Sequence, residues 1–385
     1  MGWGLQKSER EKVLHDTLVT ASAPGPEARN WVAVADMNAK IRQKAVDIKS
    51  SAVKLSLWRI VKNVVKEVSK NARHVVLIFD SPQSMPAIRE LLWKRRYSGV
   101  RAGDPLPKRD MDATLEWLDA AAHTTVAAKA EPPQRYAELF APGQLKLATW
   151  TAIENIARRI AAMDAARDGF RATVVGRDHS VFDTHPDEPA VEVPRWGEAD
   201  LKAYKVAKDC NSSGVPTVLH SVDTDLILQA VATVGGDMQS AAWTPPAPFI
   251  IALKNFRVDA VKLIARFGGA SPLLRLETVF WFIMAGGTDY TKPASDQGYA
   301  KRALCDLAHP ANLTSATVSP WTSEGPANAR TKLRLLRGTR KVARTVCGKA
   351  KKSGRNLKQA LKQAAATTLY YGLLDVEPNP AIFAA

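Results

Sequence analysis

Seven acidic residues stand where apolar runs end or where a helix would begin. Three of them directly follow the buried-strand patterns WVAVA, VVLIF and VLHSV. Because functional groups collect at the carboxyl ends of parallel strands, we expect these side chains to converge. At any single position an acid is also an ordinary helix cap or turn residue. The seven are Asp36, Asp80, Glu198, Asp200, Asp223, Asp225 and Asp289.

Converging carboxylates need a cation, because they repel one another and each raises the pKa of its neighbours. Mg²⁺ and Mn²⁺ prefer oxygen ligands and suit such a set. Two of these ions held about 4 Å apart can activate a water and stabilise the leaving oxygen in phosphodiester hydrolysis. The acids therefore predict two Mg²⁺ or Mn²⁺ ions as cofactors and a nuclease reaction.

The charge of the chain predicts a polyanion as partner. The 385 residues hold 54 Lys and Arg against 38 Asp and Glu, a formal charge of +16. Residues 330–362, here called the basic segment, carry thirteen Lys or Arg and no acid. We expect this segment to bind nucleic acid, with Arg337, Arg340, Lys341 and Arg344 among its phosphate contacts. A solvated tail or a nuclear import signal is the alternative interpretation of the same charges.

Alternating strands and helices predict an α/β fold with a mainly parallel sheet. Short apolar runs favour strands, and apolar residues three or four apart favour helices. The expected strands cover 31–36, 74–80, 171–176, 217–223 and 248–254, and the expected helices cover 44–70, 111–129, 143–167, 225–232 and 273–286. A polar loop is expected over 177–195, followed by the start of a helix in GEADLKAYKVAK.

Several other chemistries find no support in the sequence. The three cysteines are widely spaced, which disfavours both a disulfide framework and a zinc site. The seven histidines show neither metal nor triad spacing, and His220, in a predicted strand, is expected to pack in the core. No apolar run reaches the length of a membrane span, and the amino terminus lacks the apolar core of a secretory signal. We expect an intracellular protein with no membrane partner.

Six sequence blocks occur in an order that a known family shares: MGWGL, VAVADMNAKI, VVLIFDSPQSMPAIRELLWKRR, GEADLKA, SVDTDLIL and FWFIMAGGTDY. Together they resemble the flap-endonuclease/XPG family of structure-specific 5′ nucleases, and the last three blocks are the most specific. The resemblance implies a PIN-like parallel sheet flanked by helices. It also implies a metal-dependent enzyme that cuts DNA near its 5′ end, at a flap or junction.

The resemblance implies which acids share an ion. A first acidic set would surround one metal, and a second acidic set would hold the other. The first set is Asp36, Asp80, Glu198 and Asp200, and the second set is Asp223, Asp225 and Asp289. All seven acidic positions of the family pattern are filled, which favours an active enzyme over an inactive relic.

Basic residues in the matching blocks would contact the nucleic acid. Arg89 and Arg96 lie seven residues apart on one face of a predicted helix and would engage the scissile phosphate. In the family a hairpin with two glycines follows the last acidic motif, whereas DQGYAKRALCDL keeps only one. The other contacts that we expect are Gly2, Lys94, Arg95, Lys301 and Arg302.

The resemblance also predicts the organisation of the chain. Residues 1–310 would form the nuclease core, within which 81–195 would form a helical arch and an insertion. Residues 311–385 would form a basic helical extension that binds nucleic acid. We expect a monomer that acts in the nucleus or, for a virus-encoded member, in a viral replication compartment or the virion. No sliding-clamp peptide is evident in the sequence.

Two other functions fit the same residues. GEADLK and HSVDTDLILQAVAT also resemble the 5′→3′ exoribonucleases of the Xrn type and virus-encoded relatives, which makes RNA the alternative substrate. A non-catalytic nucleic-acid-binding or virion protein on a nuclease fold would keep the positive charge. The completeness of the acidic pattern argues against that third function.

Overall fold

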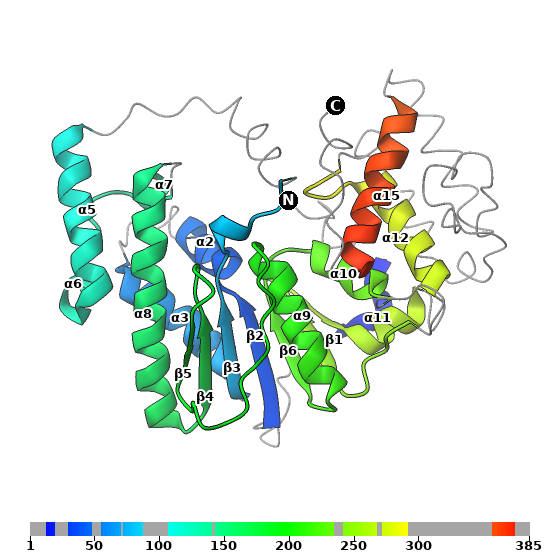
Figure 1. The fold of residues 1–385 in the computed structure, drawn as a ribbon, viewed down its shortest axis with the longest axis horizontal. Coiled ribbons are helices and arrows are strands. Elements are labelled where there is room, and N and C mark those ends of the chain that lie inside the picture. The colour runs from blue at the N-terminus through cyan, green and yellow to red at the C-terminus, as the bar shows by residue number, and fades with distance from the viewer. Residues whose placement is uncertain are drawn as a thin grey trace. The chain divides into compact units, whose positions relative to one another are not determined.

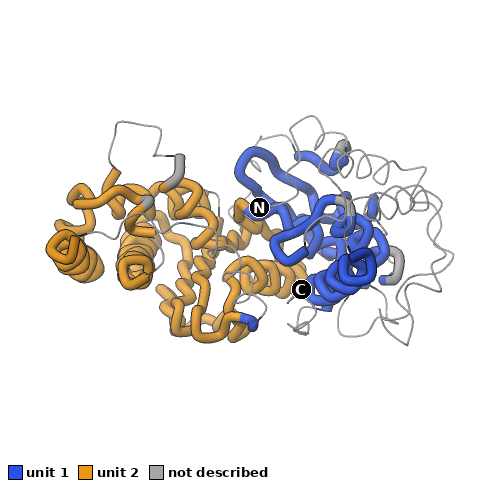
Figure 2. The backbone as a smooth tube through the Cα atoms, turned by 90° about the horizontal axis from the view of Figure 1, so that it is seen from above, with its two compact units in different colours: residues 1–21, 86–97, 223–385 blue, residues 22–85, 98–222 orange. Residues whose placement is uncertain are grey.

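The computed structural model describes residues 13–19, 30–47, 55–70, 72–87, 107–140, 143–234, 242–267, 272–291 and 356–373. Within these ranges the fold is mixed α/β, which confirms the α/β class that the sequence predicts (Figure 1). The chain divides into two compact units, which Figure 2 colours separately. Unit 1 comprises residues 1–21, 86–97 and 223–385, and unit 2 comprises residues 22–85 and 98–222.

Unit 2 contains five strands of a mainly parallel sheet, in the order β6-β2-β3-β4-β5. The parallel strands are β2 (Trp31–Asp36), β3 (Ala72–Ile78), β4 (Arg171–Val175) and β6 (Thr217–His220), and the antiparallel edge strand is β5 (Val181–Asp183). In the register of this sheet Asp36 pairs with Ile78, and Ala35 pairs with His220. The carboxyl ends of β2, β3 and β6 therefore meet at one edge.

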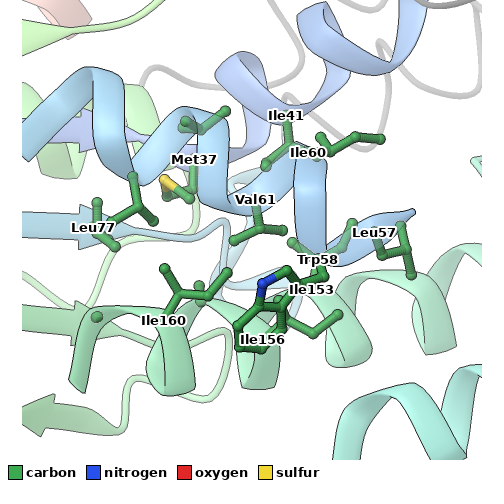
Figure 3. Close-up of a cluster of buried hydrophobic side chains, with 14 of the residues drawn as sticks. Met37, Ile41, Leu57, Trp58, Ile60, Val61, Leu77, Ile153, Ile156 and Ile160 are labelled. Atoms are coloured by element: carbon green, nitrogen blue, oxygen red, sulfur yellow. The ribbon is translucent and has the colours of Figure 1, made fainter. Parts of the chain in front are cut away.

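Helices cover both faces of this sheet. On one face α3 (Leu57–Ser69) and α8 (Gln144–Asp168) pack against each other and against β3 and β4. Figure 3 shows Trp58 of α3 beside Ile153 and Ile156 of α8. Helix α9 (Ala199–Ser212) packs against β2 and β6. The side chain of Val34 points to the opposite face of the sheet from its neighbours in β2, which lie under α3 and α8. Val34 is fully buried, so that face is covered as well.

Most of the other helices described in unit 2 also contribute residues to its hydrophobic core. These other helices are α2 (Met37–Asp47), η4 (Pro82–Ser84), α5 (Lys108–His123), α6 (Thr125–Lys129) and α7 (Tyr136–Leu139). Within the range predicted as arch and insertion, 81–195, α8 and β4 belong to the core of unit 2.

Several predicted boundaries in unit 2 are wrong for local reasons. The predicted helix 44–70 is two helices, because α2 ends at Asp47 and Ser56 caps α3 by accepting from Arg59 N at 3.3 Å. Thr124 divides the predicted helix 111–129, since its hydroxyl caps α6 through Ala127 N. The predicted strand 217–223 ends at His220, and the predicted loop 177–195 contains the edge strand β5.

Unit 1 combines a small antiparallel sheet with packed helices. Strand β8 (Arg257–Asp259) pairs with both β1 (Leu18–Val19) and β7 (Phe249–Ala252), and η1 (His15–Thr17) precedes β1. The helices are α10 (Asp225–Ala232), α11 (Ala260–Arg266), α12 (Pro272–Gly286) and α15 (Leu357–Leu373). Helix α15 lies in the region predicted as a basic extension, and it packs against α10 and α12. None of the helices among the described residues is long and apolar enough to cross a membrane.

His74 makes the stability of unit 2 sensitive to acid. It lies buried in β3, where its Nε2 contacts Thr173 Oγ1 at 2.8 Å, and that hydroxyl donates to Asp183 at 2.6 Å. Burial, and then the charge of Arg171, lower the pKa of His74 to about 4. The unfolded chain has the higher pKa and binds the proton first, so stability present above pH 6.5 is lost as the pH falls toward 4.

We therefore expect His74 to account for about 2 kcal/mol of lost unfolding free energy between pH 7.5 and pH 5. Urea denaturation of the wild type and of His74→Gln at both pH values measures this loss. The variant should lose about 2 kcal/mol less than the wild type. Equal losses in the two proteins would show that folding does not lower the pKa of His74.

Candidate functional site

The acids at the strand ends of unit 2 cap helices. Asp36 Oδ1 accepts from Ala39 N at 3.0 Å in the first turn of α2, and its Oδ2 accepts from Ser221 Oγ at 3.2 Å. Asp80 Oδ1 accepts from Ala199 N at 2.8 Å at the start of α9. Both carboxylates thus cap helices, which is the ordinary role of an acid at such a position, and these bonds fix their orientation.

The contact between Asp80 and α9 brings the rest of the first acidic set together. Glu198 is the N-cap residue of α9 and is buried, and Asp200 lies in the first turn of that helix. Gly197 makes this approach possible because a Cβ there would stand 2.6 Å from Met85 N and closer still to Ser84 O. The close approach therefore explains why the motif GEADLKA begins with a glycine, which the sequence pattern alone does not indicate.

Lys202 supplies a positive charge beside the first acidic set. Its side chain is fully buried, and its Nζ donates to Phe79 O at 2.5 Å and to Ser81 Oγ at 2.9 Å. Burial lowers the pKa of Lys202 to about 8, although the carboxylates of Asp80 and Asp36 act in the opposite direction. At neutral pH the ammonium is still mainly charged, so a side chain of the fold offsets part of the charge that we assigned to a metal.

Sequence analysis missed two further groups near these acids. Glu154 of α8 is buried and accepts from Arg177 N at 3.0 Å and from Arg158 at 2.6 Å. Its negative charge acts to raise the pKa of Lys202, as the charges of the other acids do. Nothing in the sequence signals this role, because Glu154 lies in the middle of a long helix.

The second missed group is a set of hydrogen-bonded side chains in the segments that follow β3 and β4. His179 Nε2 contacts Ser84 Oγ at 2.7 Å, and its Nδ1 contacts Ser81 Oγ at 3.3 Å. Ser81 in turn accepts from Lys202. His179 has a φ of 65°, a conformation that costs energy for a non-glycine residue. These contacts of His179 were not predicted from the sequence.

Unit 1 brings the second acidic set together through two turns. Asp223 Oδ1 accepts from Asp225 N at 2.9 Å as α10 begins. After α12, Gly287 takes a φ of 71°, the left-handed conformation that ends helices. Thr288 then closes a tight turn by accepting from Tyr290 N at 3.1 Å. This turn directs Asp289 N to Asp225 Oδ2 at 3.2 Å.

Asp225 is the most unusual acid in the described structure. It is 2 % exposed, and its Oδ2 accepts from Asp289 N and from the hydroxyl of Tyr371 at 2.8 Å. Its Oδ1 is buried and has no hydrogen-bond partner among the described residues. Burial, and then the charges of Asp223 and Asp289, raise the pKa of the Asp225 carboxyl well above its usual range.

The two acidic sets differ in how well they fit a divalent cation. In the described part of the chain no group of three or more His, Cys, Asp or Glu side chains is placed so that it could by itself hold a metal ion. The first set has Lys202 beside it. In the second set the charges of Asp223 and Asp289 act on the buried carboxyl of Asp225 and raise its pKa. Of the two sets, the one in unit 1 therefore has the donor chemistry that suits Mg²⁺ or Mn²⁺.

All seven acids lie within the described residues, whereas the predicted basic contacts do not. The residues outside the described ranges are Gly2, Arg89, Lys94, Arg95, Arg96, Lys301, Arg302, Arg337, Arg340, Lys341 and Arg344. Neither a scan against protein-family models nor a search of curated proteins finds a match to this chain.

Proposed function

We propose that the protein is a nuclease on a PIN-like core, dependent on Mg²⁺ or Mn²⁺, that hydrolyses DNA near its 5′ end at a flap or junction. The observation that carries this proposal is the buried carboxylate of Asp225, repelled by Asp223 and Asp289 and left with one unpartnered oxygen among the described residues. A buried, uncompensated carboxylate is costly, and a hard divalent cation removes the cost. The six sequence blocks supply the reaction class.

In this proposal each part of the chain has a separate task. The second acidic set holds a cation, and Asp36, Asp80, Glu198 and Asp200 hold another or orient the groups around it. When bound, the cations polarise a phosphate oxygen and acidify a water. Arg89 and Arg96 offset the charge on the scissile phosphate. That the two sets serve one two-metal centre stays a prediction.

The basic segment is expected to give affinity without sequence preference, because it binds phosphates. Deleting it from residue 330 onward would also remove α15, which packs in unit 1. We therefore replace Arg337, Arg340, Lys341 and Arg344 by Gln. For duplex DNA the slope of log K against log salt should become shallower by about 0.9 for each phosphate that these cations neutralise in the wild type. An unchanged slope would assign these charges to another role.

The experiment that tests the proposed substrate compares four 5′-labelled molecules: a flapped duplex, a nicked duplex, single-stranded DNA and the matching RNA. Each is incubated with the full-length protein in Mg²⁺, in Mn²⁺ and in EDTA. Metal-dependent cutting at the flap base supports the proposal. Preferential cutting of RNA would replace it by an exoribonuclease-like activity. Binding of every substrate with cutting of none would indicate a non-catalytic nucleic-acid-binding protein.

A further inference from the structure

The helix α15 reaches the second acidic set from far along the sequence. Tyr371, 146 residues after Asp225, is fully buried and donates its hydroxyl to Asp225 Oδ2 at 2.8 Å. Its ring also lies edge-on to the ring of Tyr290, with centroids 6.1 Å apart, and Tyr290 directly follows Asp289. One side chain thus contacts the segments that carry two of the three acids.

The end of α15 that carries Tyr371 is seated closely in unit 1. Gly372 approaches α10 and α12 so closely that a Cβ there would lie 2.8 Å from Leu276 Cδ2 and 2.9 Å from Ala232 O. The carbonyl of Gly372 accepts from Val234 N at 3.2 Å. These contacts fix the position of the helix end and leave the Tyr371 hydroxyl little freedom to move.

A second contact ties the same helix to the turn that carries Asp289. Thr367, one turn before Tyr371, has its hydroxyl 2.7 Å from that of Thr291, and both side chains are buried. The Thr291 hydroxyl also contacts Gln363 O at 3.3 Å. Helix α15 therefore holds the segment 288–291 and the start of α10 in one arrangement.

We propose that Tyr371 is a positioning residue of the candidate cation site. Its hydroxyl donates a hydrogen bond to Oδ2 of Asp225, and this leaves Oδ1 to bind the cation. The inference rests on the proposed function. Asp225 has two oxygens, and the described structure uses only Oδ2 in hydrogen bonds. A carboxylate held at one oxygen cannot rotate freely, so the other oxygen keeps a fixed direction. Groups that orient a metal ligand in this way typically contribute a factor of about 10–100 to metal affinity.

The test is Mn²⁺ binding to the full-length protein after removal of metal with EDTA, measured by titration calorimetry. Tyr371→Phe removes the hydroxyl and keeps the ring. Thr368→Val is the matched control, because Thr368 is buried in the same helix and its hydroxyl bonds to Ala364 O at 2.8 Å, a carbonyl of α15 itself. We expect the dissociation constant for Mn²⁺ to rise about 10–100-fold in Tyr371→Phe and to stay near the wild-type value in Thr368→Val.

The outcomes separate this inference from the proposed function. Wild-type binding that is unchanged in Tyr371→Phe overturns the positioning role and leaves the proposed function standing. A Tyr371→Phe protein that fails to fold in EDTA, while Thr368→Val folds, assigns the hydroxyl to stability and also overturns the role. If the wild-type protein itself binds no Mn²⁺, the proposed function fails, and the inference fails with it.

Discussion

Gly197→Ala is expected to lower the free energy of unfolding by about 2–3 kcal/mol, the usual cost of forcing an extra methyl into a packed site. The added Cβ would overlap Ser84 O and stand 2.6 Å from Met85 N. These are backbone atoms, so no side-chain rotation relieves the overlap. Gly197 O also accepts from Ser81 N at 2.6 Å, which holds the two segments together.

The same substitution should disturb the first acidic set, because Gly197 directly precedes Glu198 and the start of α9. The control is Gly214→Ala in the same unit. Gly214 has a φ of 80°, and a Cβ there would meet nothing within 4 Å, so only backbone strain of about 1 kcal/mol is expected. Urea denaturation of both variants gives the comparison. A loss at position 197 no larger than that at position 214 would show that the close approach is absent.

Asp225→Asn is expected to abolish cleavage and to stabilise the protein when no metal is bound. The amide keeps the shape of the carboxylate and can still accept from Tyr371 and Asp289 N, but it removes a buried charge that Asp223 and Asp289 repel. Because the folded-state pKa of Asp225 is raised, its ionised form opposes folding at neutral pH. We expect a gain of about 0.5–2 kcal/mol in EDTA, as for other stabilising substitutions.

Cleavage should fall by more than about 100-fold in the same variant, because a catalytic cation contributes several kcal/mol of transition-state stabilisation. Asp209→Asn is the control, since Asp209 lies at the surface of α9, where it pairs with Lys205. Both its stability and its cleavage rate should stay close to the wild-type values. A loss of stability in Asp225→Asn would mean that the carboxylate is already compensated in the folded protein.

Local patterns predicted the elements whose signals lie within a few residues. The strand 31–36 and the helix 225–232 have their predicted bounds, because each is an apolar run ended by a polar residue. Helix α15 was not predicted as a helix packed in unit 1. Its buried residues are Ala, Thr, Tyr and Gly, which give a weak apolar period, although a basic helical extension was predicted over 311–385. The edge strand β5 has only three residues and partly polar surroundings.

The candidate site likewise contains residues that could be predicted from the sequence and residues that could not. Its acids could be predicted because they follow strands, and the carboxyl ends of parallel strands share an edge. Lys202 and Tyr371 could not, because the sequence around each gives no sign of burial. Lys202 has the sequence surroundings of a solvated helical lysine, and only its depth in unit 2 shows that it faces carboxylates. The partner of Tyr371 is 146 residues away.

The central claim is that these acids bind the cations that phosphodiester hydrolysis requires. The most direct test is single-turnover cleavage of a 5′-labelled flap by the EDTA-stripped full-length protein, with Mg²⁺ added back in steps, for the wild type and Asp225→Asn. We expect no product in EDTA, product that rises with Mg²⁺ in the wild type, and almost none in the variant at the same Mg²⁺. Equal cleavage by the two proteins, or no cleavage by the wild type at any Mg²⁺ or Mn²⁺ concentration while it still binds the flap, would contradict the account.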